Sequence, residues 1–446
     1  MRRRRKFEGM RRAITLLLAV VITFAATFAA NAQRRRAVAP LPDDSTLTTT
    51  EWLQKRAMPF ATTEAESGLD DLASLHPLVR NARVVALGEA THGSREFFTM
   101  KHRVLEYLVE RMGFTVFAIE AALPESDAVN EYVLHGTGDP AVALNGLGFW
   151  TWDTDEVLAM IEWMRAYNLR RGERPPLSFR GFDMQSSTVA VTRLRAYLER
   201  VDPDALASAN ALLACWTPYM RRSGYSSRPA AERTACTTSL AQLYAGLEAK
   251  RGDYVARSSA GEFEQHLRYA RVIAQNQHRD SLDTAGQRSA TRDRYMAENT
   301  EWLADVAHRG EKLVLWAHNY HVRTDLPQPM GAHLRARFGR DLVVFGFVFD
   351  RGAFNAYSGG VLRANTVRSW NGGTEEVLRS AGHARMFVDL RDIGSTAARS
   401  YFRGNRTLWQ IGALFETEAG ARVTTPLATA YDVIIWIEET TASRLR

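Results

Sequence analysis

Short apolar runs rich in β-branched residues alternate along this chain with long amphipathic segments, and no other feature limits the possible fold as much. The runs lie at residues 83–87, 115–119, 177–182, 312–316, 342–349, 386–390 and 433–437. Continuous apolar runs of about five residues are typical of strands that are buried on both faces. Residues 96–111, 153–170 and 292–308 have helical spacing, with polar side chains on the opposite face. The alternation predicts an α/β fold with a mainly parallel central sheet flanked by helices.

The alternation stops between about residues 187 and 310, where no run resembles a strand. This stretch is rich in Ala, Leu, Arg, Gln and Glu, which predicts a helical insertion lobe. Cys215 and Cys236, the two cysteines of the chain, both lie in it. An exported protein would carry them into an oxidising compartment, where a disulfide between neighbouring helices and two buried free thiols are both open. Neither cysteine has the neighbouring histidine and acid that indicate a nucleophile.

The first 32 residues have the three parts of a signal peptide. A basic start is followed by an apolar stretch rich in Ala, Leu and Val, and then by Ala30-Asn31-Ala32, a small-x-small cleavage pattern. We expect cleavage before Gln33 and a periplasmic or secreted protein that has no membrane association after cleavage. An uncleaved N-terminal anchor is the alternative, because the apolar stretch is long for a signal peptide.

The predicted signal peptide also explains the basic charge of the chain. The formal net charge is +7, but residues 1–32 hold seven of the 57 Lys and Arg residues and one of the 50 Asp and Glu residues. The remainder carries 50 basic and 49 acidic side chains, so we expect no nucleic-acid partner. A linker rich in Pro, Asp and Thr is expected over residues 33–50, and the folded domain over residues 51–446.

Ionisable residues follow four of the predicted strands at their C-terminal ends. Parallel strands bring these ends to one edge of the sheet, where open α/β folds form their active sites. A single such residue is more often a structural polar group, but the shared position predicts a common site. The residues expected to converge are Glu89, His92, Glu120, Asp183, His318 and His321.

The sequence lacks the motifs of several familiar enzyme classes. It has no G-x-S-x-G, H-E-x-x-H or P-loop pattern, and no G-x-G-x-x-G that opens a helix. Histidine and carboxylate remain, and an imidazole with an ordinary pKa near 6.5 can take a proton from water near neutral pH. Lys101 is a candidate cation for stabilising the oxyanion that would form. An exposed lysine on the helix surface is the alternative.

Several blocks of the sequence resemble the erythromycin esterase family in order and spacing. They include Leu-Gly-Glu-Ala-Thr-His-Gly at 87–93, Phe-Trp-Thr-Trp at 149–152, Arg292-Asp293, and Trp-Ala-His-Asn-Tyr-His at 316–321. The resemblance covers most of the chain from about residue 50 onwards. It implies an α/β hydrolase with a helical lobe, and some members of the family open macrolide lactones by hydrolysing the ring ester.

The resemblance implies roles for individual residues. His92 is expected to be the general base for water. Glu89 and Glu120 would orient and polarise it, and His318 would line the opposite wall of the cleft as the fourth catalytic residue. The residues expected to bind a small-molecule ester or lactone are Lys101, His321, Trp152 and Asp183. Lys101 stands where macrolide-opening members carry arginine, so a bidentate clamp on the substrate is not available.

Two other functions stay open beside this metal-independent and cofactor-independent hydrolase. A hydrolase that depends on zinc or manganese would use His318 and His321, with His92 and one of the two glutamates, as a mixed ligand set. An exported haem-type binding protein without turnover would use Trp150 and Trp152 as stacking platforms. The glutamate and histidine set favours catalysis, because a pure binding protein does not need a polarised base.

Overall fold

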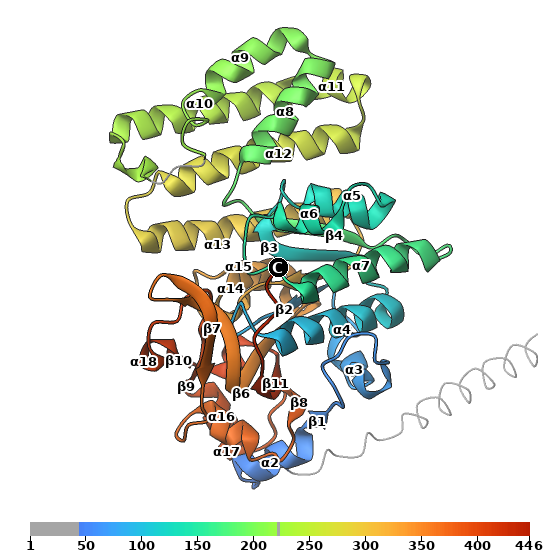
Figure 1. Ribbon diagram of the computed structural model, residues 1–446, viewed down its shortest axis with the longest axis vertical. Coiled ribbons are helices and arrows are strands. Elements are labelled where there is room, and N and C mark those ends of the chain that lie inside the picture. Colours follow the sequence, from blue (N-terminus) through green and yellow to red (C-terminus); the bar gives the residue numbers. More distant parts are fainter. Residues whose placement is uncertain (1–43, 221–223) are drawn as a thin grey trace, which may run out of the picture.

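The computed structural model describes residues 44–220 and 224–446. It has a central sheet with helices on both faces and a stack of further helices, α8 to α12, at one end of the molecule (Figure 1). Within the described residues, no helix is both long and apolar enough to cross a membrane. The predicted signal peptide, its cleavage site and linker residues 33–43 lie outside the described residues and stay predictions.

The central sheet of the described chain has nine strands in the order β1-β8-β11-β6-β2-β5-β3-β4, with β7 paired to β6. They are β1 (Met58–Pro59), β2 (Val84–Leu87), β3 (Val116–Ala122), β4 (Ser178–Asp183), β5 (Leu313–Trp316), β6 (Leu342–Ser358), β7 (Val361–Val367), β8 (Arg385–Asp389) and β11 (Val433–Thr440). The strands from β11 to β4 in this order are parallel to one another, whereas β1, β7 and β8 pair antiparallel. The predicted mainly parallel sheet is confirmed, with the correction that the run at 386–390 forms an antiparallel strand.

Helices bury both faces of the parallel strands, which explains why these strands are continuously apolar. In β2, Val84 and Ala86 belong to one core cluster, and Val85 and Leu87 belong to the cluster on the other face. Helices α4 and α7 pack on the Val85 side, and α13 and α15 pack on the Val84 side. Successive side chains of a strand point to opposite faces, so every position in β2 must be apolar.

The helices that the structure describes begin before the predicted domain start at residue 51. Thr48 caps α2, and Glu51 completes a capping box with it. The longer helices are α2 (Thr49–Arg56), α4 (Arg95–Met112), α5 (Asp127–His135), α7 (Asp155–Arg170), α8 (Thr188–Val201), α9 (Pro203–Leu213), α10 (Ala230–Ala249), α12 (Ala260–Asp280), α13 (Ala285–Trp302), α15 (Met330–Phe338) and α17 (Thr396–Arg403). The shorter ones are α3 (Leu75–Val79), α6 (Pro140–Asn145), α11 (Arg251–Arg257), α14 (Asn319–Val322), α16 (Thr374–Arg379), α18 (Glu418–Ala421) and α19 (Leu427–Ala430).

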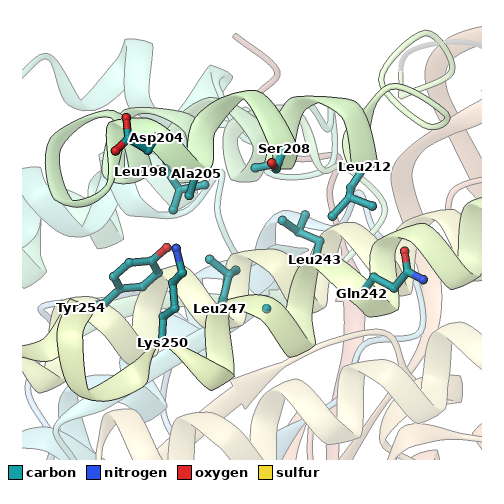
Figure 2. A pocket seen from close by; sticks show the side chains of 12 residues that line it. Leu198, Asp204, Ala205, Ser208, Leu212, Gln242, Leu243, Leu247, Lys250 and Tyr254 are labelled. Atoms are coloured by element: carbon teal, nitrogen blue, oxygen red, sulfur yellow. The ribbon is translucent and has the colours of Figure 1, made fainter.

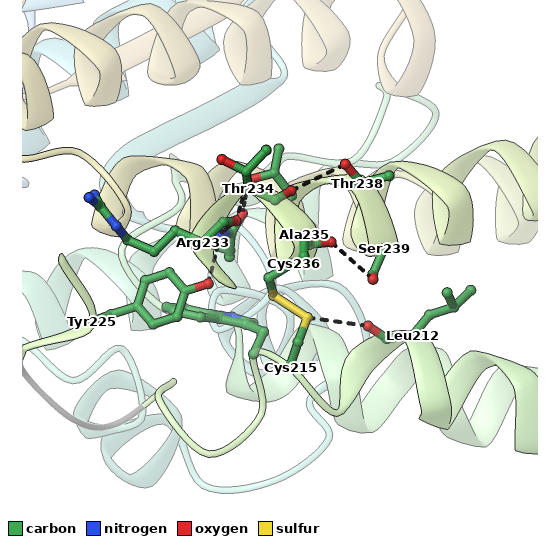
Figure 3. The surroundings of a disulfide bond; sticks show 12 residues. Leu212, Cys215, Tyr225, Arg233, Thr234, Ala235, Cys236, Thr238 and Ser239 are labelled. Carbon is green, nitrogen blue, oxygen red and sulfur yellow. Dashed lines mark hydrogen bonds between the residues drawn. A yellow bond between two sulfur atoms is a disulfide. The ribbon is translucent and has the colours of Figure 1, made fainter. Parts of the chain in front are cut away.

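The segment between β4 and β5 forms a lobe that contains only helices among its described residues. Helices α8 to α12 enclose a core of their own, and α13 lies between this lobe and the sheet (Figure 1). Of the two states that the sequence left open for the cysteines, the disulfide is the one formed. It joins Cys215, just after α9, to Cys236 in α10, with 5.5 Å between the two Cα atoms (Figure 3).

Strand β6 continues well beyond the predicted end at residue 349. Its last residues pair antiparallel with β7 from Gly352 to Ser358. Here the three consecutive residues Phe354, Asn355 and Ala356 are buried, whereas Tyr357 is 36% exposed. We call this β6–β7 hairpin the arm. Because β2 pairs with the start of β6, the arm extends past the C-terminal end of β2.

Candidate active site

The loop that follows β2 places His92 against Glu89 at the C-terminal edge of the sheet. His92 Nδ1 lies 2.6 Å from Glu89 Oε1. The side chain of Glu89 is fully buried, whereas that of His92 is 13% exposed. An ionised carboxylate can only accept hydrogen bonds, so His92 donates through Nδ1 and keeps a free lone pair on Nε2. A general base needs this arrangement.

Three donors keep Glu89 ionised. Lys101 Nζ lies 2.6 Å from Glu89 Oε2, Trp316 Nε1 donates to the same oxygen at 2.8 Å, and His92 binds the other oxygen. Burial alone would raise the pKa of Glu89, but the charge of Lys101 and the hydrogen bond from His92 outweigh it, and the pKa lies below its ordinary value. Glu89 therefore keeps its charge at neutral pH despite its burial.

Lys101 is completely buried in α4, so the alternative of an exposed surface lysine is wrong. Its ammonium group also lies 4.2 Å from the centre of the Trp316 ring, a cation–π distance. Glu89 and Trp316 occupy the ammonium group of Lys101, so Lys101 stabilises the charge of the carboxylate that orients His92. Its role in substrate binding stays a prediction.

His318 presents an N–H group beside His92. The backbone N–H of Tyr320 donates to His318 Nδ1 at 3.1 Å, so the proton of the neutral ring is on Nε2. Burial, together with the neighbouring imidazoles of His92 and His321, lowers the pKa of His318 to about 3. His318 Nε2 is buried and has no hydrogen-bond partner within the described protein, and the ring centre lies 5.1 Å from that of His92. The geometry leaves this N–H free for a ligand.

Arg292 in α13 ties the ends of β3 and β4 together. Its guanidinium group forms hydrogen bonds of 2.8 to 3.2 Å with the Asp183 carboxylate and one of 2.6 Å with Glu120 Oε1. Burial alone would raise the pKa of Glu120, but the charges of His321 and Arg292 hold it well below its ordinary value. Glu120 Oε2 accepts the backbone N–H of His318 at 2.9 Å. Through Glu120, the arginine thus fixes the strand end that carries His318.

His321 lies behind this network. Its Nδ1 is 2.7 Å from Asp293 Oδ1, and its Nε2 is 3.1 Å from Arg292 Nη1 and 3.3 Å from Glu120 Oε1. Burial disfavours the imidazolium ion, but the carboxylates of Glu120 and Asp293 outweigh it and raise the pKa of His321. Both ring nitrogens are therefore engaged by neighbouring side chains.

The remaining predicted substrate contacts lie below the surface of the site. Trp152 is 1% exposed, its Nε1 donates to the Glu120 carbonyl oxygen at 3.1 Å, and its ring packs edge-on against His92 at 5.9 Å. Asp183 is fully buried and bound to Arg292. Other protein groups occupy the polar atoms of Trp152, Asp183 and His321, and the substrate-binding role of these residues stays a prediction. They support the site from behind.

Residues 441–446, which we call the C-terminal segment, hold two loops of the site in place. Ser443 N–H donates to the Gly93 carbonyl oxygen at 2.9 Å, next to His92. Asp155 N–H donates to the Arg444 carbonyl oxygen at 2.9 Å, and Arg444 N–H donates to the Glu156 carboxylate. The loop that carries His92 and the loop that carries Trp152 are therefore fixed relative to each other.

Gly412, in the loop after β9 (Arg406–Trp409), passes close to both histidines. Its carbonyl oxygen accepts a hydrogen bond from the backbone N–H of His92 at 3.3 Å. A Cβ atom on Gly412 would lie 3.8 Å from His318 Nε2 and 4.0 Å from His92 Cδ2. Its φ of +67° is in the left-handed region that favours glycine. The backbone of this loop is one wall of the space between the two imidazoles.

All eight residues predicted for the site lie together at the C-terminal edge of the sheet. The sequence analysis did not predict which of them face the space between the two imidazoles and which lie behind it. It also gave no role to Arg292 and Asp293, although both lie in a block that carries the family resemblance. Trp316 and Gly412 were missed. Trp316 reads as the last apolar residue of a strand, and Gly412 lies in a loop without any motif.

In the parts of the chain that the structure describes, no three His, Cys, Asp or Glu side chains are grouped to hold a metal ion. The glutamates proposed as ligands are paired with cations instead, Glu89 with Lys101 and Glu120 with Arg292.

Several cavities lie apart from these residues. One, of about 300 Å³, opens between α9 and α10 in the lobe, where Leu212, Leu243 and Leu247 line it (Figure 2). Another, of about 560 Å³, lies between the loop after β3 and the start of α8. None of the eight predicted site residues lines either cavity.

The C-terminal edge of the mainly parallel sheet thus carries a buried glutamate, a histidine that it orients and a second, neutral histidine, at the place where open α/β folds form their active sites. The chain belongs to the erythromycin esterase family, whose model matches residues 109–440. The match begins after Glu89 and His92, so the assignment of these two residues rests on the motif and on the geometry described above.

Two curated relatives and one solved structure are similar to this chain over most of its length. The putative hydrolase YbfO of Bacillus subtilis (strain 168) is 23% identical over 88% of this chain and 91% of its own length. Erythromycin esterase type II of Escherichia coli is 24% identical over 77% of this chain and 89% of its own length. A Bacillus cereus protein of known structure has the same fold, with a TM-score of 0.82 and 24% identity over 89% of this chain and 98% of its own. The chain is thus a member of a hydrolase family.

Proposed function

We propose that this protein hydrolyses carboxyl esters or lactones with water activated by His92. One observation carries the proposal: His92 is oriented by an ionised, buried glutamate and lies beside the unpartnered N–H of His318. The first group can take a proton from water, and the second can donate a hydrogen bond to the oxygen on which negative charge develops.

The reaction would proceed in two proton-balanced steps. Water bound at His92 Nε2 attacks the carbonyl carbon of the ester, a C–O bond forms, and the water proton passes to His92. The carbonyl oxygen becomes an oxyanion, to which His318 Nε2–H donates. The bond to the alcohol then breaks, and the departing alkoxide takes the proton from the imidazolium, which restores His92. Glu89 keeps its charge throughout and stabilises the imidazolium between the two steps.

A panel of purified substrates tests the proposal. It contains a small alkyl ester, a six-membered lactone and a macrolide, and acid release is titrated at constant pH. Hydrolysis of at least one of them well above the uncatalysed rate is the expected result. Failure of the folded protein with every ester and lactone would refute the proposal. Loss of activity in EDTA and its recovery with zinc or manganese would favour the metal-dependent alternative, and a haem band in the visible spectrum would favour the binding protein.

The buried Lys101 predicts an alkaline limit to this activity. Burial lowers the pKa of Lys101 to about 8, although Glu89 partly offsets the effect. Above that pH the ammonium group loses its proton, and Glu89 loses the cation that balances its charge. We expect kcat/KM to fall up to about tenfold per pH unit above about pH 8.

Lys101→Arg is the matched variant for this prediction, because a guanidinium group stays charged at all pH values used. We expect the alkaline decline to move to higher pH in this variant. The measurement is kcat/KM from about pH 6 to about pH 10 for both proteins. Identical alkaline limbs would show that Lys101 does not set the limit.

A further inference from the structure

Three partly exposed apolar side chains lie on segments that adjoin the candidate active site, and we call them the rim. They are Trp150 in the loop between α6 and α7, Tyr357 at the end of the arm, and Leu414 in the loop after β9. The backbone N–H of Tyr357 donates to the Ala413 carbonyl oxygen at 2.9 Å, and the backbones of Tyr357 and Leu414 form an isolated parallel β-bridge. The rings of Trp150 and Tyr357 meet edge to face with 6.1 Å between their centres. The rim is therefore one connected surface built from three distant parts of the chain.

Both ends of the rim lead directly to the histidines. Leu414 lies two residues beyond Gly412, whose backbone borders the space between His92 and His318. At the other end, Trp150 lies two residues before Trp152, which packs against the His92 ring. The rim therefore adjoins, on both sides, the segments that border the two histidines.

All three rim side chains are at least partly exposed to solvent. Leu414 is 64% exposed and Tyr357 is 36% exposed, and Trp150 is half-buried. Removing apolar surface from water lowers the free energy. An exposed apolar patch beside a reactive centre is therefore a candidate binding surface. By contrast, the four residues that the sequence predicted for substrate binding have their polar groups occupied by the protein.

We infer that the rim binds an extended apolar group next to the scissile ester and sets a preference for esters with long alkyl chains or rings. The inference rests on the proposed function for its catalytic test, but binding to the rim can be measured without turnover. The rim residues determine specificity and take no part in the proton transfers.

Leu414→Ser tests the inference with ethyl acetate and ethyl octanoate as substrates. Removing most of the apolar contact of a leucine is expected to lower kcat/KM for octanoate by roughly tenfold, with little change for acetate. Leu169→Ser is the matched control, because Leu169 is 71% exposed and lies in the last turn of α7, far along that helix from the loop that carries Trp152. The inference is overturned if Leu414→Ser changes both esters by the same factor, or neither.

A binding measurement separates this inference from the proposed function. The Kd of octanoate, measured by calorimetry, is expected to rise by roughly tenfold in Leu414→Ser and to stay unchanged in Leu169→Ser. If neither ester is hydrolysed but this difference is found, the proposed function fails and the apolar subsite stands. If esters are hydrolysed and the Kd is equal in all three proteins, the proposed function stands and the rim inference fails.

Discussion

The His92→Gln variant is expected to lose about 10²- to 10⁴-fold in kcat on any ester that the wild-type protein hydrolyses. Glutamine can still donate a hydrogen bond to Glu89, but its amide cannot take a proton from water. Because the side chain of His92 is partly exposed and follows a strand end, we expect the free energy of unfolding to change little. Steady-state kinetics should therefore show the loss in kcat. Urea unfolding should show that the free energy of unfolding of the variant is close to that of the wild-type protein.

His76→Gln is the control for this variant. His76 is exposed in the short helix α3, which precedes β2 and so lies toward the opposite end of that strand from His92. It should retain wild-type kcat. A folded His92→Gln protein with near-native kcat on a confirmed substrate would show that the proposed mechanism is wrong.

Arg292→Leu is expected to lower the free energy of unfolding by about 3–5 kcal/mol, the range observed when one partner of a buried ion pair is removed. The arginine is the shared partner of Asp183 and Glu120, whose side chains are 0% and 6% exposed. Leucine fills part of the space but leaves the buried Asp183 carboxylate without its cation and Glu120 with only His321 beside it. Urea unfolding at neutral pH measures the effect, and activity should fall with it because Glu120 positions His318.

A surface arginine and a second substitution make this prediction specific. Arg271→Leu removes a guanidinium group that is 43% exposed and pairs with Glu298, and it should cost only about 0–1 kcal/mol. Adding Asp183→Asn to Arg292→Leu removes one of the uncompensated charges and should recover part of the lost stability. If the double variant is no more stable than Arg292→Leu alone, charge burial is not the cause of the loss.

Much of the sheet and the place of the site could be predicted because these features depend on local patterns. The run at 83–87 reads as a doubly buried strand without reference to any other part of the chain, and Glu89 and His92 follow it within a few residues. The arm could not be predicted in the same way. Beyond residue 349 the apolar run is interrupted by Asp350, Arg351 and Gly352, although the strand continues to Ser358.

The layers of the site could not be predicted because each depends on a distant partner. Lys101 has the spacing of a helix residue. Only its contact with Glu89, in the loop after β2, shows that the ammonium group of Lys101 is buried. Trp152 reads as an aromatic loop residue suited to ligand stacking until its indole N–H is seen to donate to Glu120. The rim residues Tyr357 and Leu414 carry no motif, and their place beside His92 arises from pairing between separate loops.

The C-terminal segment has a consequence for the order in which the molecule folds. Arg444 and Glu156 are 288 positions apart in the sequence, and the contact of Ser443 with Gly93 spans a longer loop still. Closing such loops costs chain entropy before any contact compensates for it, so contacts of this range form late. We therefore expect helical circular dichroism to return early during refolding from urea. Esterase activity should return in a later phase, when the last strand and the residues after it dock onto the loops that hold His92 and Trp152.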